Sequence, residues 1–428
     1  MTFNEVRVID DTEDHFTYIA EITKSNEQED AFYVLDVGDV VEQHRKWLST
    51  IPRVEPHFAI KCNPNGTVIK TLAALNAGFD CASKEEISQV LSAGVSGDRI
   101  IFANTMKQNS HIKYARMVGV TNLTVDSEEE LYKMKNLFPE ANIIIRFRCD
   151  AAVSEIELGS KSGCDPIFEA PQLVKKTREL GLNLHGFSFH VGSDCGEPMA
   201  YGRGIGIAQN LFKYAESHGF QNVKLLDIGG GFPGGDKSID EIAKIINEAL
   251  EGVDPSIRVI SEPGRYYVAS AFTLASFVFG KKTVTEEGKI RNMYWINDGN
   301  FGSFIDHLLA IKTYSPIALN KPVCEKKYLS TIWGPTLDPY DCVIRDHWFP
   351  ELKIGDWLVW PNMGAYTLSL AGTFNGILPP AVFPFIKREA LKSLDLEQKT
   401  HPKIKSLFGT EENHWDQQSK STSVTIIQ

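Results

Sequence analysis

The fold is decided by the stretch Leu225-Leu226-Asp227-Ile228-Gly229-Gly230-Gly231-Phe232-Pro233-Gly234. A short apolar strand runs directly into three consecutive glycines. Glycine has no Cβ, so backbone N–H groups can approach a bulky anion, and the residue tolerates a positive φ. The pattern predicts a phosphate-binding turn at the end of a buried strand. A tight turn without a ligand is the alternative interpretation.

The same unit, a short apolar run followed by a helix-like segment, repeats on both sides of this stretch. The strand-like runs are His57–Lys61, Gly78–Ala82, Arg99–Ala103, Asn122–Val125, Asn142–Phe147, Gly186–Val191, Lys224–Ile228 and Arg258–Glu262. Eight strands alternating with helices predict an α/β fold, a (β/α)8 barrel of the TIM type over residues 36–270. By this count the glycines end the seventh strand, where such barrels commonly bind phosphate.

After residue 270 the predicted strands follow one another without helical spacers. They are Phe272–Val278, Asn292–Asn297, Tyr328–Ile332, Asp356–Val359 and Ala381–Ile386. This change of rhythm predicts a C-terminal antiparallel β domain over residues 271–390, which the N-terminal segment 1–35 would join. Residues 391–428 are polar and Ser/Thr-rich, and we expect a mobile tail there.

Composition narrows the classes of function. The 428 residues carry a formal net charge of −11, which argues against nucleic acid or an anionic membrane as the main partner. No apolar run is long enough to span a bilayer, and residues 1–5 lack the basic start of a signal peptide. The seven cysteines form no CxxC pair and no zinc-like cluster, so we expect no metal site and a cytoplasmic location.

Several polar residues stand at the ends of the predicted barrel strands, where the chemistry of this fold is located. They are Lys61, Asp80, Arg146, His190, Glu262 and Arg265. Lys61 is either a surface lysine or an amine that forms a Schiff base with a carbonyl. His190 is either a hydrogen-bonded core histidine or a ring that stacks on an aromatic cofactor.

Pyridoxal phosphate (PLP) would use all of these groups together. A carboxylate keeps its pyridine nitrogen protonated so that the ring can accept electrons, and Glu262 is the candidate, with Asp80 as a second acid. Arg265 would add charge-assisted bonds to the phosphate. A lysine, a stacking histidine, a buried acid and a glycine nest specify this cofactor better than any one of them alone.

Several motifs resemble eukaryotic ornithine decarboxylase in one register from about residue 30 to 390. The matching runs are residues 58–63, 78–84, 188–193, 226–234, 262–267, 297–299, 333–336 and 362–367. The resemblance implies a PLP-dependent amino-acid decarboxylase of polyamine biosynthesis, with an alanine-racemase-like barrel and a β domain. It also implies a head-to-tail homodimer with shared active sites, and antizyme as a further partner through the segment around Lys113–Asn142.

The resemblance also assigns roles to individual residues. Lys61 matches the Schiff-base lysine, His190 the ring-stacking histidine and Glu262 the pyridinium partner. The residues that match the phosphate-binding set are Ser193, Gly229, Gly230, Gly231, Arg265 and Tyr366. Asp80 and Arg146 match residues that line the site, and Asp338 matches an acid that reaches the substrate's distal amine from the neighbouring subunit.

Two departures from the family bear on the substrate. Leu337 stands where the family has a catalytic cysteine, and Leu309 and Ala310 align without gaps to a Tyr-Asp pair whose carboxylate binds ornithine. Leaving a buried ammonium without one partner costs about 2–5 kcal/mol. The changes therefore favour an apolar substrate such as L-leucine. Without the thiol, we expect slower turnover with some protonation at the wrong carbon.

Two other functions stay open at this point. One is ordinary ornithine decarboxylation to putrescine, if Asp338 or the nearby Asp306 suffices for the amine. The other is a non-catalytic regulator like the antizyme inhibitors, which keep the fold but lose cofactor binding. The retained lysine, histidine, glycines and arginine favour an enzyme over a regulator.

Overall fold

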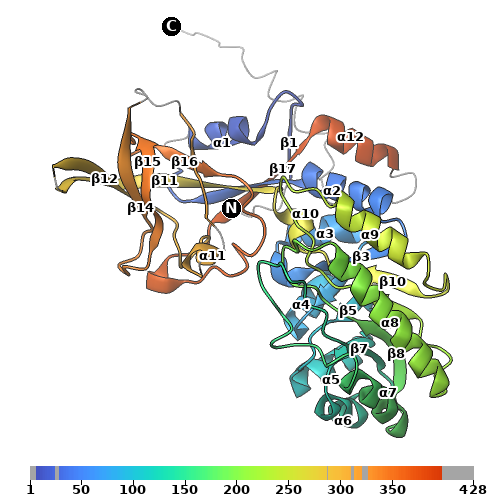
Figure 1. Cartoon of the computed structure of the whole chain (residues 1–428). Coiled ribbons are helices and arrows are strands. Elements are labelled where there is room, and N and C mark those ends of the chain that lie inside the picture. Colours follow the sequence, from blue (N-terminus) through green and yellow to red (C-terminus); the bar gives the residue numbers. More distant parts are fainter. Residues whose placement is uncertain (1–5, 25–27, 287, 310–312, 321–325, 398–428) are drawn as a thin grey trace.

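The computed structural model describes residues 6–24, 28–286, 288–309, 313–320 and 326–397, and they form two lobes (Figure 1). One lobe is a closed barrel of eight parallel strands, which confirms the predicted (β/α)8 fold. In barrel order, starting from the barrel strand that comes first in the chain, they are β3 (Val54–Ala59), β4 (Gly78–Cys81), β5 (Ile100–Phe102), β6 (Asn122–Val125), β7 (Asn142–Arg146), β8 (Asn183–Ser188), β9 (Leu225–Asp227) and β10 (Arg258–Ser261). The triple glycine follows β9, the seventh barrel strand, as the sequence predicts.

Helices surround the barrel strands in the expected alternation. They are α2 (Val37–Thr50), α3 (Gly66–Ala74), α4 (Lys84–Ser92), α5 (Asn109–Met117), α6 (Glu128–Leu137), α7 (Glu169–Glu179), α8 (Met199–Ser217), α9 (Asp240–Leu250) and the short α10 (Arg265–Val268). Their starts follow local capping chemistry. Ser127 caps α6 by accepting a hydrogen bond from the Glu130 N–H, and acids fill the first turn, where the helix dipole favours them.

The second lobe is built on a nine-stranded sheet. Its strands are β1 (Arg7–Ile9), β2 (Phe32–Asp36), β11 (Phe272–Glu286), β12 (Lys289–Ile296), β13 (Ile317–Ala318), β14 (Lys327–Trp333), β15 (Cys342–Pro350), β16 (Trp357–Trp360) and β17 (Ala381–Lys387). Most pairs are antiparallel, but β1–β17, β17–β2 and β12–β14 are parallel. The N-terminal strands therefore belong to the β lobe, so the chain enters the barrel from this sheet and returns to it.

Three helices accompany the sheet: α1 (His15–Thr23), α11 (Ile305–Leu308) and α12 (Arg388–Glu397). Helix α12 corrects the expected start of the tail at residue 391, because the chain stays helical to Glu397. Its Leu394 is buried, and Arg45 of α2 donates a hydrogen bond to Ser393. Figure 1 shows α12 beside α2, so this helix joins the two lobes. Residues 398–428 lie outside the described part.

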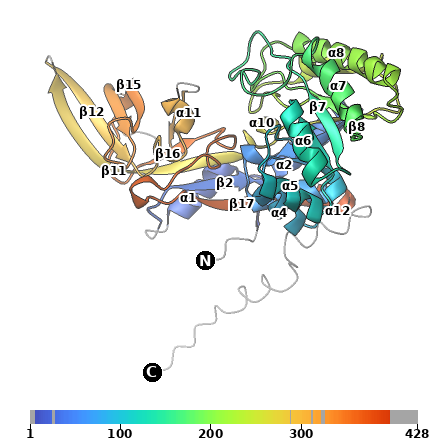
Figure 2. The ribbon, with the colours of Figure 1, turned by 90° about the horizontal axis from the view of Figure 1, so that it is seen from below.

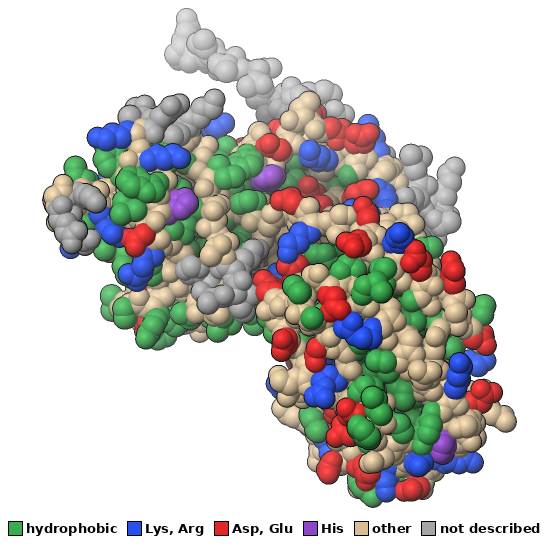
Figure 3. All heavy atoms as spheres, in the orientation of Figure 1, with side chains coloured by type: hydrophobic (Ala, Val, Ile, Leu, Met, Phe, Trp, Pro, Cys, Tyr) green, Lys and Arg blue, Asp and Glu red, His purple; other side chains and the backbone are tan. Residues whose placement is uncertain are grey.

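The two lobes are clearly separate in the view from below (Figure 2), and chain segments from both meet at α10 and α2. On the face shown in Figure 3, basic and acidic side chains are interspersed over the lobes. Within the described residues, none of the helices is both long enough and apolar enough to cross a membrane.

Candidate active site

The candidate residues gather at the carboxyl ends of the barrel strands. Lys61 lies in the 3-10 turn that directly follows β3 (η1, Ile60–Cys62), rather than at the last strand position as predicted. At the end of β3 the Ala59 N–H donates to the carbonyl of Pro263, in the loop after β10, and the backbone then enters the turn. The turn still directs the lysine into the barrel mouth.

Lys61 and Asp80 form the first pair of the site. Lys61 Nζ lies 2.5 Å from Asp80 Oδ2, and the Asp80 side chain is fully buried at the end of β4. Burial opposes the charge on Lys61, but Asp80, Glu262 and Tyr366 together raise its pKa. The amine is therefore an ammonium held by a carboxylate. Among the described residues, Asp80 Oδ1 has no hydrogen-bond partner.

A second pair of the site consists of two buried acids, Glu262 and Asp227. Burial, then the charges of Asp227 and Asp80, raise the pKa of Glu262 well above its ordinary value. Burial also raises the pKa of Asp227 to about 6, against the opposing effect of hydrogen bonds to Glu262 and to the Gly229 N–H at 2.9 Å. The two carboxyl groups therefore retain a proton at neutral pH. Asp227 was not predicted as a site residue, although an acid inside an apolar strand indicates a buried polar group.

His190 lies beyond β8 and is half-buried. Its Nδ1 accepts a hydrogen bond from the Gly192 N–H at 3.0 Å, which leaves the proton of the neutral ring on Nε2. Burial, and then the positive charges of Arg146 and Lys61, lower the pKa of His190 well below its ordinary value. The imidazole is therefore neutral. Arg146, at the end of β7, is close enough to Glu262 to favour its ionised form.

The three glycines make a cradle that side chains would fill. Gly229 and Gly231 have positive φ angles of 66° and 98°, and a Cβ at either would collide with a carbonyl of the loop after β8. Within the described part of the chain, the N–H groups of Gly230 and Gly231 donate to no protein acceptor. Adjacent backbone donors without a protein acceptor bind anions.

Arg265 borders the cradle and is nine-tenths buried. Its Nη2 lies 3.4 Å from Ser193 Oγ, and its guanidinium lies over the ring of Tyr366, 5.3 Å from the centroid. Tyr366 comes from the β lobe with φ at 56°, and its N–H donates to the carbonyl of Cys62. Among the described residues, Arg265 Nε has no partner, as expected for a group that binds an external anion.

The acid that contacts this arginine was not predicted from the sequence. Glu155 Oε2 lies 2.6 Å from Arg265 Nη2, and both side chains are largely buried. Glu155 belongs to the long segment between β7 and α7, where it precedes a single antiparallel bridge between Ile156 and Ser193. Nothing in its local sequence indicated a contact with a residue more than a hundred positions away.

The predicted substrate residues do not join this cluster within one chain. Leu337 is 95% exposed and Leu309 is 59% exposed, while Ala310 lies outside the described residues. Asp338 caps its own turn by accepting a hydrogen bond from the Tyr340 N–H.

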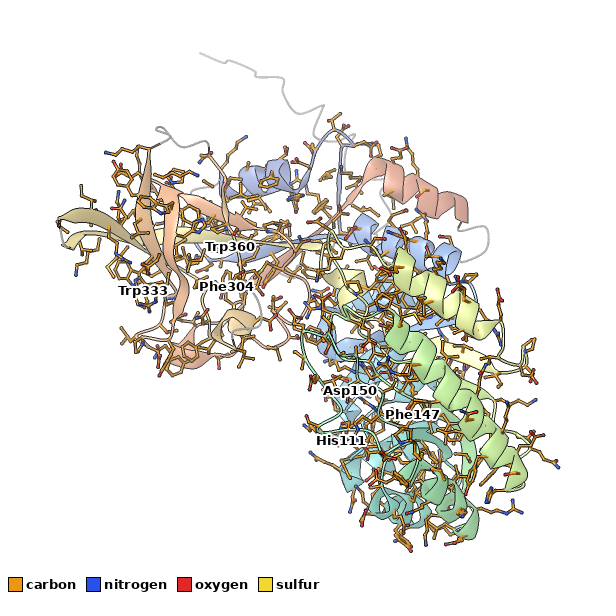
Figure 4. The ribbon with its side chains drawn as sticks, viewed as in Figure 1. His111, Phe147, Asp150, Phe304, Trp333 and Trp360 are labelled. Carbon is orange, nitrogen blue, oxygen red and sulfur yellow. The ribbon has the colours of Figure 1, made fainter. Side chains whose placement is uncertain are left out.

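Asp306, in α11, is buried instead. Its charge adds to burial in raising the pKa of the Cys62 thiol to about 12. Phe304, just before α11, packs edge-on against Trp360 (Figure 4), which places this helix.

The donors present fit PLP. They include an amine beside a carboxylate, a protonated acid, a neutral imidazole, and a cradle whose amides and arginine nitrogen have no partner among the residues that the structure describes. Six cysteines are described, all buried and unpaired, and the described residues hold no metal-ligating cluster of three or more. The amine, the acid, the imidazole and the cradle are together the groups that an organic cofactor bearing a phosphate requires.

Comparison with known proteins identifies the same chemistry. The family described as pyridoxal-dependent decarboxylase, pyridoxal binding domain, matches residues 37–269. Mouse (Mus musculus) ornithine decarboxylase is 41% identical over 381 residues, which cover 85% of this chain and 82% of the mouse protein. Antizyme inhibitor 2 of Xenopus laevis is 42% identical over 388 residues, 87% of this chain and 85% of that protein.

A solved structure gives the same assignment. Arginine decarboxylase of Paramecium bursaria Chlorella virus, bound to agmatine, superposes with a TM-score of 0.82 and 34% identity, covering 87% of this chain and all of the viral one. The chain therefore belongs to the ornithine decarboxylase family of carboxy-lyases, whose cofactor is pyridoxal phosphate.

Proposed function

We propose that the chain releases CO2 from an L-amino acid at the mouth of its barrel and forms the corresponding amine. One arrangement carries the proposal: the Lys61 ammonium at 2.5 Å from buried Asp80, with Glu262 and Arg265 on the same rim. Bound PLP supplies an electron sink for the charge left on Cα when CO2 departs.

Lys61 is the proposed attachment point for the cofactor. A protonated amine is not a nucleophile, so the ammonium has to lose a proton before it can react with an aldehyde. Asp80 lies where it can hold the ammonium in position and accept that proton. Its second oxygen, which has no partner among the described residues, leaves the carboxylate free to do so.

Glu262 and His190 are the proposed ring contacts. Glu262 retains a proton because it is buried beside Asp227, so it can share this proton with a pyridine nitrogen. His190 is neutral and offers a flat uncharged face to an aromatic ring. Arg146 stabilises the ionised form of Glu262 once the proton has moved.

The phosphate is assigned to the cradle. The amides of Gly230 and Gly231, the hydroxyl groups of Ser193 and Tyr366 and the guanidinium of Arg265 are its proposed donors. Charge-assisted hydrogen bonds from arginine are roughly twice as strong as neutral ones, so Arg265 contributes most.

For the substrate side chain we propose an apolar group such as that of L-leucine. The support is chemical: Leu337 replaces a thiol, and Leu309 and Ala310 replace the pair that binds a distal ammonium. Leu309 and Leu337 are exposed, so the core of their own lobe does not require them to be apolar. Residues of this kind suit a pocket wall completed by a second subunit.

A basic substrate such as ornithine is the second candidate, and Asp306 favours it. This carboxylate is buried in α11 and acts electrostatically on Cys62, the neighbour of Lys61. It could pair with a distal ammonium although it is out of register with the family acid. The resemblance to ornithine decarboxylases points the same way.

A non-catalytic regulator is the third candidate, since an antizyme inhibitor is 42% identical to this chain. The intact set of Lys61, Asp80, Glu262 and Arg265 argues against it, because a binding module has no use for a lysine paired with a buried acid in a barrel mouth. We also propose a homodimer with shared active sites, located in the cytoplasm, where free thiols like those of the described cysteines persist. Antizyme is the proposed regulatory partner.

The test is CO2 release by the purified protein with added PLP from ornithine, lysine, arginine, leucine and other aliphatic amino acids. We expect release from leucine or a similar apolar substrate, and loss of it in Lys61→Ala. The double variant Ala310→Asp/Leu337→Cys should shift preference toward ornithine. Preferential release from ornithine by the unmodified chain would select the second candidate. Failure to bind PLP would select the regulator.

A further inference from the structure

The ion pair between Arg265 and Glu155 is unusual for an arginine assigned to phosphate. Arg265 Nη2 lies 2.6 Å from Glu155 Oε2, and the side chains are only 10% and 16% exposed. The pair is therefore largely shielded from solvent. Ionic contacts are stronger in such a place than in water. A carboxylate already occupies a nitrogen that a phosphate oxygen would contact.

The backbone around Glu155 holds it in this position. The Glu155 N–H donates to the Ser193 carbonyl at 2.8 Å, and the Ser193 N–H donates back to the Ile156 carbonyl at 3.0 Å. The Gly196 N–H donates to the Val153 carbonyl at 2.9 Å. Glu155 is thus attached to the loop that also carries Ser193, another proposed phosphate donor.

The same segment is anchored at its other end. Asp150, beside the barrel in Figure 4, accepts a hydrogen bond from the Gly159 N–H at 2.9 Å, and its carbonyl accepts one from Arg203 at 3.0 Å. The Ala152 N–H donates to Glu197 at 2.6 Å. Contacts at both ends of the segment therefore hold Glu155 beside Arg265 as part of the folded backbone.

The charges at Arg265 predict the consequence for binding. The guanidinium is already neutralised by Glu155, so a phosphate dianion enters a site without net positive charge from this pair. The carboxylate also repels the phosphate at short range, because two like charges are brought together in a site shielded from solvent. Either the phosphate shares Arg265 with Glu155, or the carboxylate leaves Nη2.

We infer that Glu155 is an internal competitor for the phosphate at Arg265 and weakens the retention of pyridoxal phosphate by this protein. The inference rests on the proposed assignment of Arg265 to the phosphate. It predicts a cofactor that exchanges readily, so that the fraction of loaded protein depends on the PLP concentration.

The test measures the Kd of PLP, of pyridoxal without its phosphate, and of inorganic phosphate on the cofactor-free full chain. Glu155→Gln should bind PLP and phosphate roughly ten- to a hundredfold more tightly than the unmodified chain, since it removes a like charge at short range. Pyridoxal should bind equally to both. Glu157→Gln, which changes an exposed acid of the same segment, is the matched control and should change none of the three constants.

The same substitution in an Arg265→Gln chain separates an effect that acts through Arg265 from a general effect on folding. In Arg265→Gln, adding Glu155→Gln should improve PLP affinity less than it does in the unmodified chain, because the competition for the shared nitrogen is gone and only the repulsion by the carboxylate remains. Glu155→Ala should reproduce the effect of Glu155→Gln if the charge matters and not the amide. Thermal unfolding of each cofactor-free variant reports whether it is folded.

The outcomes distinguish this inference from the proposed function. If PLP binds more tightly than pyridoxal but Glu155→Gln binds it no better than the unmodified chain, Glu155 supports Arg265 and the inference is wrong. A gain that extends to pyridoxal, or that persists fully in Arg265→Gln, also overturns it. If PLP binds no better than pyridoxal to any variant, the phosphate site itself is wrongly assigned, and the proposed function fails with it.

Discussion

Asp227 and Glu262 bring two carboxyl groups together in the interior, and this pair links the site to the stability of the cofactor-free protein. Asp227 is the last residue of β9, and the register places it beside Ile260 of β10, two positions before Glu262. Burial raises the pKa of Asp227 to about 6, and the pKa of Glu262 is raised as well. The folded state thus binds a proton that the unfolded chain releases near pH 4.

The sign of the pH effect follows from this linkage. Above about pH 4 the folded state holds more protons than the unfolded state, so the pair loses stabilisation as pH rises toward the raised pKa values of the two acids. Asp227→Asn removes one charge, while its amide oxygen can still accept from Gly229 N–H and its NH2 can donate to Glu262. We expect the variant to gain stability relative to the unmodified chain on going from pH 4.5 to 7, by about 1–3 kcal/mol.

Unfolding in urea at several pH values, without cofactor, measures this difference. Asp236→Asn, an exposed acid after the same glycine stretch, is the control and should leave the pH dependence unchanged. A pH profile of Asp227→Asn parallel to that of the unmodified chain would mean that the pair does not hold the proton.

At the scale of elements, a buried network of charged side chains joins the segment after β5 to β6 and α6. Lys107 Nζ contacts Glu130 Oε1 at 2.8 Å with both side chains fully buried, and also donates to the Thr124 carbonyl at 2.6 Å. Lys133 Nζ bonds the other Glu130 oxygen at 2.6 Å. Burial lowers the pKa of Lys107 to about 8, and the carboxylate opposes that shift. Glu130 therefore allows the ammonium to remain inside.

Glu130→Gln leaves Lys107 buried without its counter-charge. We expect the free energy of unfolding to fall by about 3–5 kcal/mol, as when one partner of a buried ion pair is removed. Glu129→Gln is the matched control, because it removes an exposed acid from the same first turn of α6 and should change stability by less than about 0.5 kcal/mol. Equal unfolding midpoints for the two variants would contradict a structural role for the network.

Elements with strong local patterns could be predicted, and those set by distant contacts could not. The barrel strands are short buried runs between amphipathic helices, so their order and the residues at their ends follow from the sequence. Strand β15 was missed because exposed residues 345–348 interrupt its apolar pattern, and Asp346 has a positive φ. Glu155 was not predicted as a site residue because its contact with Arg265 depends on the folding of the long connection between β7 and α7.

At the scale of the molecule, the β lobe carries large apolar side chains that remain exposed in a single chain. Leu337 is 95% exposed, and Leu378 and Tyr340 are 77% and 71% exposed. Apolar side chains exposed to this degree on one lobe suit a subunit interface. They agree with the proposed head-to-tail homodimer, in which Leu337 and Asp338 enter the barrel mouth of the partner subunit.

Mixing two inactive variants tests this arrangement. Lys61→Ala destroys the amine in its own barrel, whereas Leu337→Arg puts a charge into the substrate pocket of the partner without touching the core of its own chain. Each homodimer should be inactive toward the preferred substrate. After the two are mixed and allowed to exchange subunits, half of the dimers are mixed, and each has one intact site. Activity should therefore recover to about a quarter of that of the unmodified protein.

Gel filtration of each variant is the control that both remain dimeric. Dimeric variants that stay inactive after subunit exchange would mean that Leu337 serves the site of its own chain, and the shared-site homodimer would have to be abandoned.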